Sequence, residues 1–245
     1  MKIRGADTIL PAGTNPLKNN YLLRALRGVL VWSAACGGHA ATPRPEPTAP
    51  LPTAGIAAQQ VSVLPLTLIA VDDSLRWQAS LGERRAALAK RDSVVGALLR
   101  ERAPEVNWIF PDELRRAARR APGVAPDPDR MGTAILLHGG RPPELVPDPL
   151  RSELRTLAAL AGAGGGRYAL VPAGLILRRS GGATAATSTG AAGPGAPGAG
   201  TAELTVVIVD VRTGRIGFRT VARGEGDDPW MALTRAVKSL TPGLP

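Results

Sequence analysis

The sequence predicts an α/β domain in which a small mixed sheet of about four to five strands has helices packed on it and ends in a carboxy-terminal β-hairpin followed by a helix. Three observations predict this class. Runs of β-branched and aliphatic residues alternate with segments whose apolar residues recur at helical spacing. Asp148-Pro149 and Asp228-Pro229 each combine a helix cap with a proline suited to the first helical position. Thr213-Gly214 separates two apolar runs as the turn of a hairpin does.

The first elements are expected between residues 60 and 102. Residues 60–70 are rich in Val, Leu and Ile and predict a strand that bends at Pro65, because proline removes one donor of the ladder. Ser80 and Glu83 have the spacing of a capping box and predict the start of a long amphipathic helix that ends near Arg102. The apolar stripe of this helix consists of Leu88, Val95, Leu98 and Leu99.

A short strand at 106–110 and a short helix at 112–120 are expected next. The helix after Asp148 has an apolar stripe formed by Leu150, Leu154, Leu157 and Leu160. Three strands are expected at 168–177, 204–211 and 216–221. The middle one is apolar on both faces apart from Thr205 and Asp210, which predicts a central strand covered on both sides. The last helix follows Asp228, with Trp230, Leu233, Val237 and Leu240 on one face.

The amino-terminal residues have the order of a secretory signal. Residues 21–36 place Arg24 and Arg27 next to a short apolar stretch, followed by small residues and the only cysteine, Cys36. The segment resembles a bacterial lipoprotein signal, with Ser33-Ala34-Ala35-Cys36 as its lipobox, and the resemblance implies a diacylglycerol on Cys36. The alternatives are a signal peptide cut at an Ala-x-Ala-like site and a short buried helix with an incidental thiol.

The composition divides the rest of the chain. Five prolines lie between Pro43 and Pro52, and such a segment stays extended and hydrated. We therefore expect a signal segment at 1–36, a Pro-rich tether at 37–57 and a single α/β domain at 58–245. Residues 180–201 are almost entirely Gly, Ala, Ser, Thr and Pro. They predict a disordered loop, because they bury too little apolar area to offset the entropy of ordering.

Charge and cysteine content exclude several kinds of chemistry. The formal net charge is +10, but part of it lies in the leader and the rest is Arg spread along the chain, which needs no anionic partner. With one Cys and two His, the chain lacks the residues for a multi-ligand zinc site, an iron–sulfur cluster or an internal disulfide. No cofactor is expected.

Three groups of polar residues are candidates for chemistry. His138-Gly139-Gly140 resembles an esterase oxyanion segment, but no G-x-S-x-G motif accompanies it, so a loop histidine is the simpler interpretation. The carboxylates at 72–73, 127–129 and 227–228 lie at turns or helix starts and predict capping, with metal binding by Asp127 and Asp129 as the alternative. A cationic stripe suited to an anionic surface, or simply a solvated helix face, is formed by Arg115, Arg116, Arg119 and Arg120.

The order of elements is similar to a family of envelope domains. The resemblance rests on Val61 to Leu66, on Pro111 to Leu114, on Arg167 to Val171 and on the hairpin phrase from Val207 to Ile216. Residues 58–245 thereby resemble the domain shared by curli-secretion-channel lipoproteins, penicillin-binding-protein activator lipoproteins and the amino-terminal domain of the Tol-system propeller protein. The chain also looks like an uncharacterised group of predicted bacterial lipoproteins. The resemblance implies protein binding or assembly and transfers no catalytic residue.

These features together predict a non-enzymatic cell-envelope lipoprotein that acts as a protein-binding or assembly module. It is expected to be exported and anchored through acylated Cys36 at the outer membrane, facing the periplasm, with an envelope protein as its partner and no nucleic acid. Two alternatives remain open at this stage. One is a basic nucleic-acid-binding protein that uses the net charge, and the other is a hydrolase that uses His138.

Overall fold

The structure is a computed structural model and describes residues 49–139, 144–161, 166–180 and 199–241. These residues contain the strands β1 (Gln60–Val63), β2 (Ile69–Val71), β3 (Asn107–Ile109), β4 (Tyr168–Arg179), β5 (Gly200–Asp210) and β6 (Arg215–Gly226). The α-helices are α1 (Gln78–Leu81), α2 (Arg84–Arg102), α3 (Pro111–Arg120), α4 (Leu150–Ala161) and α5 (Pro229–Leu240). Short 3-10 helices are η1 (Thr53–Ile56), η2 (Asp73–Leu75), η3 (Pro128–Arg130) and η4 (Thr133–Leu137).

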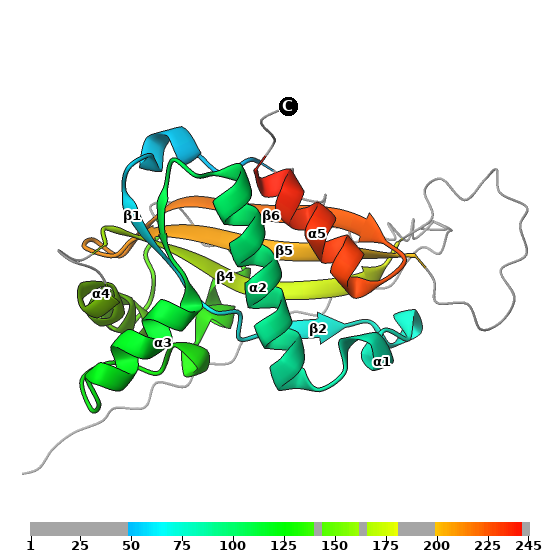
Figure 1. Cartoon of the computed structure of the whole chain (residues 1–245), viewed down its shortest axis with the longest axis horizontal. Helices are drawn as coiled ribbons and strands as arrows, with labels where there is room; N and C mark the ends of the chain where they lie inside the picture. The colour runs from blue at the N-terminus through cyan, green and yellow to red at the C-terminus, as the bar shows by residue number, and fades with distance from the viewer. Residues whose placement is uncertain (1–48, 140–143, 162–165, 181–198, 242–245) are drawn as a thin grey trace, which may run out of the picture. The chain divides into compact units, whose positions relative to one another are not determined.

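All six strands belong to one mixed sheet with the order β3-β1-β4-β5-β6, and β2 pairs separately with β4 (Figure 1). β1 is parallel to β3 and β4, whereas β4, β5 and β6 are successively antiparallel. The chain turns between β5 and β6 at Gly214, whose φ of 73° suits a residue without a side chain. The predicted α/β class, with its closing hairpin and final helix, is confirmed.

The segment at 60–70 forms two strands instead of the expected single bent one. β1 and β2 both run parallel to β4, and Pro65 lies between them. The interruption is local, since the N–H of Leu64 still donates to the carbonyl of Leu170 at 3.0 Å. Leu64 and Leu66 remain buried on either side of the proline. The missing donor of Pro65 accounts for the break.

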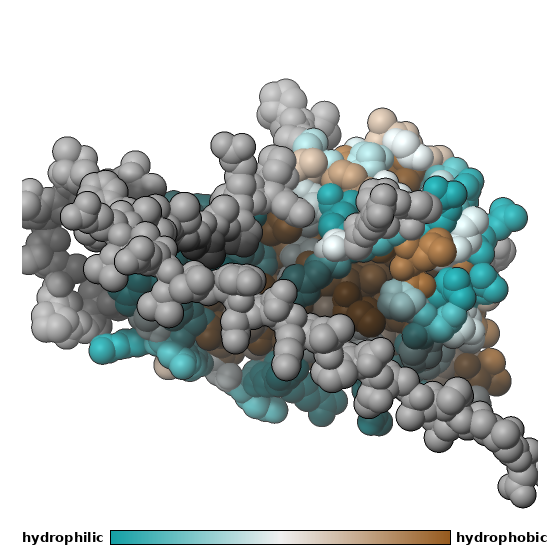
Figure 2. Space-filling model, turned by 180° about the vertical axis from the view of Figure 1, so that it is seen from behind, coloured by the Kyte–Doolittle hydropathy of each residue, from teal (hydrophilic) through white to brown (hydrophobic). Residues whose placement is uncertain are grey.

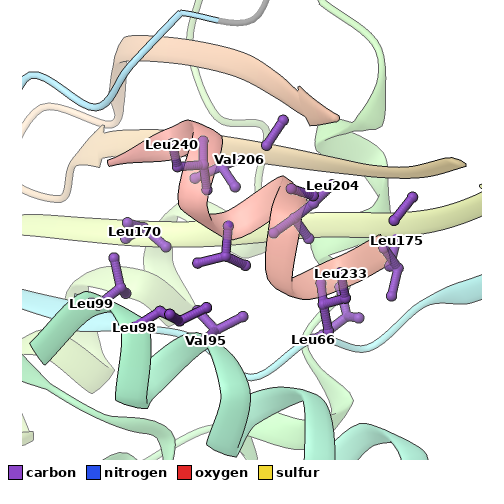
Figure 3. Packing of buried hydrophobic residues seen from close by; sticks show 14 of the residues in the cluster. Leu66, Val95, Leu98, Leu99, Leu170, Leu175, Leu204, Val206, Leu233 and Leu240 are labelled. Atoms are coloured by element: carbon purple, nitrogen blue, oxygen red, sulfur yellow. The ribbon is translucent and has the colours of Figure 1, made fainter. Parts of the chain in front are cut away.

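One face of the sheet packs against α2 and α5. Figure 3 shows Val95, Leu98 and Leu99 pointing from α2 toward the sheet, with Leu99 nearest Leu170 of β4, and Leu233 of α5 belongs to the same cluster. In β5 the side chains of Leu204, Val206 and Ile208 belong to this cluster. Because the buried residues of α2 and α5 recur at helical spacing, each helix presents one apolar stripe to the sheet.

The opposite face packs against α3, α4 and η4. Val207 and Val209 of β5 point into this second cluster, which confirms a central strand covered on both sides. The expected stripe of α4 supplies Leu150, Leu154 and Leu157, while Leu160 is only half-buried. Figure 2 views the molecule from behind and shows hydrophobic residues at the surface in the middle of this side.

One of the predicted helix starts is confirmed and another is wrong. Asp228 caps α5 by accepting hydrogen bonds from the N–H groups of Trp230 and Met231, as expected. The predicted capping box of Ser80 and Glu83 does not form. Ser80 lies inside the short helix α1, and α2 begins only after Glu83, whose side chain makes no cap bond. Gly82, with φ of 67°, separates the two helices and explains the difference.

The folded region begins before residue 58, where the tether was expected to end. Leu51 and Ile56 are buried in the first core cluster, and the N–H of Leu51 donates to the carbonyl of Leu240 at 2.8 Å. Two apolar side chains thus hold the end of this segment against the core. The Cys36 signal and residues 181–198 of the expected loop lie outside the described residues. Within the described chain, no helix is long and apolar enough to cross a membrane.

Candidate functional site

A groove of about 960 Å³ lies between the first turns of α2, the helix α3 and the segment 125–129. Leu66, between β1 and β2, lies at its base and is buried. One wall consists of Glu83 and, from α2, Arg84, Arg85, Leu88 and Ala89, and the wall from α3 consists of Arg115, Ala118 and Arg119. The remaining lining is Ala125, Asp127, Pro128 and Asp129. The groove therefore combines apolar side chains with guanidinium groups from two helices.

An ion-pair network joins the two helical walls. The guanidinium of Arg115 on α3 donates to Asp92 of α2 at 2.8 Å and to both carboxylate oxygens of Asp129, at 2.7 and 2.9 Å. Asp112 accepts a further bond from Arg115 at 2.9 Å. The other oxygen of Asp92 pairs with Arg91, which precedes it on α2. Arg115 therefore ties α3 to α2 and to the 125–129 segment.

The two arginines of this network have opposite pKa shifts. Arg91 is fully buried, and its desolvation lowers the pKa of the guanidinium despite the neighbouring Asp92. The hydrogen bonds that Arg115 donates to Asp129 and Asp92 raise the pKa of its guanidinium above the usual value, although partial burial opposes them. Within the described residues, Nε and Nη2 of Arg91 have no hydrogen-bond partner. Arg91 therefore depends on Asp92 for compensation of its buried charge.

The rim of the groove carries cations that the network does not use. Arg85 and Arg119 are exposed, and neither side chain makes an ion pair or hydrogen bond to any described residue. Arg84 is partly committed, because it donates to the carbonyl of Thr67 at 3.0 Å. α2 begins at the same rim without an acidic residue in its first turn. The partial positive charge of a helix start thus adds to the arginines.

The four arginines predicted as one cationic stripe fall into three environments. Arg115 is half-buried in the network, Arg119 lines the groove, and Arg116 and Arg120 are exposed outside it. The structure therefore does not present them as one uniform face. This division follows from the helical period, because residues 115 and 119 lie one turn apart on the groove side of α3.

The candidate carboxylates act as caps and ion-pair partners. Asp127 accepts the N–H of Asp129 and caps η3, and Asp72 accepts the N–H of Ser74 and caps η2. Asp129 receives Arg115. Over the described ranges, no group of three or more His, Cys, Asp or Glu side chains is placed to hold a metal ion. Capping, the expected role, is confirmed for Asp72, Asp127 and Asp228.

His138 lies exposed at the end of η4. Among the residues that the structure describes, its side chain makes no hydrogen bond or ion pair. Cys36, the expected lipid attachment site, lies outside the described residues.

Sequence reasoning missed Arg84, Arg85 and the Arg91-Asp92 pair. A signal for the pair exists in the apolar stripe of α2. Leu88 and Val95 are seven residues apart, and the turn between them carries Arg91 and Asp92 where further apolar side chains would complete the stripe. Such an interruption indicates charges that are paired within the fold. No comparable pattern distinguishes Arg85, which lines the groove together with residues of α3.

Comparisons with known proteins find structural likeness only. No family model and no curated protein sequence matches the chain. The solution structure of LpoB from E. coli is 14% identical, with 92% of this chain and 96% of that chain covered and a TM-score of 0.35. The LpoB carboxy-terminal domain from Salmonella enterica is 14% identical, covers 69% of this chain and 83% of its own, and has a TM-score of 0.34.

A PelC dodecamer from Paraburkholderia phytofirmans is also similar, at 11% identity and a TM-score of 0.32. That match covers 81% of this chain and 94% of the PelC chain. All three TM-scores are below 0.5. No role is therefore transferred from these proteins to this chain.

Proposed function

We propose that the chain is a non-enzymatic cell-envelope lipoprotein whose α/β domain docks a protein partner in the groove between α2 and α3. The observation that carries this proposal is the groove itself. It joins an apolar floor at Leu66 and Leu88 to the exposed arginines Arg85 and Arg119. An apolar base with a charged rim is the usual composition of a protein-binding surface.

The proposal that the protein is exported rests on its amino-terminal sequence. Residues 21–36 have the order of a lipoprotein signal, and the prolines from Pro43 to Pro52 suit a spacer between an acylated Cys36 and the domain. In this proposal the lipid holds the protein at the outer membrane, facing the periplasm. The single thiol of the chain is then consumed by acylation rather than left free.

Anchoring is tested by fractionation of host cells and by mass spectrometry of the amino-terminal peptide. The expected result is an envelope fraction and a peptide that begins at Cys36 with a diacylglycerol. An unmodified peptide that runs through Cys36 contradicts the lipoprotein assignment. Recovery of the protein from the cytoplasm favours the nucleic-acid-binding alternative.

Docking is tested by crosslinking the tagged full chain in its own host and identifying the envelope protein that copurifies. The double variant Arg85→Glu/Arg119→Glu should lose that protein, because it reverses both exposed cations of the rim. Arg116→Glu/Lys238→Glu is the matched control, since both residues are exposed and neither lines the groove. Equal capture by the two double variants contradicts a role for the groove.

A further inference from the structure

The groove also indicates the chemistry of its partner, an inference that rests on the proposed function. We infer that it binds an acidic amphipathic segment of a protein, with carboxylates at Arg85 and Arg119 and apolar side chains on Leu88. Four arginines and three acidic residues line the groove, so its total charge alone is nearly balanced. The preference for an acidic ligand comes from which of these charges are already paired.

The three acidic residues of the groove differ in their partners. Asp129 accepts two bonds from Arg115, whereas Asp127 accepts only the backbone N–H of Asp129 and forms no ion pair with a described residue. Only Glu83 makes no side-chain hydrogen bond to a described residue. On the cationic side, Arg85 and Arg119 are both uncommitted among the described residues, and they stand on opposite walls. An exposed guanidinium without a carboxylate partner among the described residues therefore stands on each wall of the groove.

The start of α2 also lies at this rim, directly after Glu83. α2 has 19 residues, no side chain caps its first turn, and that turn contains no acidic residue. Its unbonded N–H groups lie at the rim next to Arg84 and Arg85. A carboxylate placed there interacts with two guanidinium groups and with the helix start together.

The floor requires the ligand to have an apolar side as well. Leu88 is half-buried, and Ala89, Ala118 and Ala125 line the groove around it. Val124, beside Ala125, is 70% exposed. A free anion such as phosphate would leave this surface in water. A peptide with carboxylates on one side and aliphatic side chains on the other covers both kinds of surface.

Two other anionic ligands fit the groove less well. A flat layer of lipid headgroups reaches exposed side chains, so it would engage Arg116 and Arg120 as readily as Arg119. Single-stranded nucleic acid is commonly held by aromatic side chains that stack on its bases, and none of the lining residues, all of them within the described chain, is aromatic. An acidic peptide bound in the groove would contact Arg119 but neither Arg116 nor Arg120.

The test begins with selection from a random-sequence peptide library displayed on phage, using the full chain as bait. The selected peptides should be rich in Asp and Glu interleaved with aliphatic residues. A synthetic peptide of that consensus should then bind the wild-type chain in fluorescence anisotropy. Arg85→Glu and Arg119→Glu should each weaken binding about tenfold, and added salt should weaken it further.

Arg116→Glu is the control for general charge, because it makes the same change on the same helix outside the groove. It should leave the affinity for the peptide unchanged within about a factor of two. Leu88→Ser tests the floor and should also weaken binding. The inference is overturned if no acidic consensus emerges, or if Arg116→Glu weakens binding as much as Arg119→Glu does.

Two further measurements would show that the groove or its arginines bind something other than an acidic peptide. Equal loss of binding to phosphatidylglycerol vesicles in Arg116→Glu and Arg119→Glu, with no peptide binding, would assign the arginines to a membrane surface. Self-association in sedimentation that Arg119→Glu abolishes would assign the groove to a second copy. If the groove captures a partner in cells but selects no acidic peptide, the proposed function stands and only the inferred chemistry fails.

Discussion

Arg115 and Arg119 lie one turn apart on α3, yet their surroundings differ completely. Arg115 pairs with three carboxylates from α2, α3 and the 125–129 segment, whereas Arg119 pairs with none among the described residues. The difference arises because the network around Arg115 is partly buried and the rim around Arg119 is exposed. Arg115 thus helps to hold the fold together, whereas Arg119, which belongs to the same sequence pattern, remains available for a partner.

The largest expected effect comes from breaking the network at its most buried carboxylate. Asp92→Asn leaves the guanidinium of Arg91 buried without a counter-charge and should lower the free energy of unfolding by about 3–5 kcal/mol. Urea unfolding measures this change. Asp129→Asn is the control, because Asp129 is 48% exposed and its loss should cost less than about 1 kcal/mol. Equal effects of the two substitutions would mean that Arg91 does not depend on Asp92.

Arg115→Met should have the next largest effect. It removes the bonds to Asp92 and Asp129 that join the groove walls, and we expect a loss of about 2 kcal/mol in the same unfolding measurement. Arg116→Met is the matched control on α3 and should change the free energy of unfolding by no more than about 0.5 kcal/mol. A similar loss in both variants would contradict the division between paired and available arginines.

A smaller, pH-dependent effect is expected at Asp210, whose ion pair with Arg167 lies outside the network. Partial burial raises the pKa of Asp210, but bonds from Arg167 and from the N–H groups of Thr213 and Arg212 outweigh it and lower the pKa below its usual 3.8. Because the folded pKa is the lower one, the charged form stabilises the fold at neutral pH. That contribution is lost as the pH falls from the unfolded pKa through the folded pKa.

Asp210→Asn should therefore cost about 1 kcal/mol at neutral pH, and its difference from the wild type should shrink below about pH 4. Unfolding titrations at several pH values measure this difference. A difference that stays constant through the acid range would show that the ion pair contributes nothing through its charge.

Arg85→Glu and Arg119→Glu should have the smallest effects on stability. Both side chains are exposed and unpaired among the described residues, so the free energy of unfolding should change by about 0.5 kcal/mol or less. Their effect on binding should nevertheless exceed that of any control variant. A loss of several kcal/mol would place these arginines in the fold rather than at a docking surface.

Much of this fold follows from local sequence, while the groove does not. The cap at Asp228, the turn at Gly214 and the stripe of Val95, Leu98 and Leu99 each act within a few residues, and the structure has all of them. The capping-box error arose because a glycine two residues beyond Ser80 allows one short helix to end before another begins. These are effects of neighbours along the chain.

The groove depends on residues far apart in sequence. Arg115 reaches Asp92 across 23 positions, and Arg85 and Arg119 share the groove only because α2 and α3 lie beside each other. The sequence identified the arginines of α3 as a cationic group but could not separate paired from unpaired members. That separation depends on burial and on partners from other elements, which periodicity does not specify.

The most direct test of the groove places a photo-crosslinking residue in the full chain in its host envelope, at position 89 or at position 97. Ala89 and Ala97 are both exposed on α2, and only Ala89 lines the groove. We predict that the residue at position 89 crosslinks one envelope protein and that Arg119→Glu abolishes this product. No partner should crosslink at position 97. The same product from both positions, or a product at position 89 that persists in Arg119→Glu, would contradict docking in the groove.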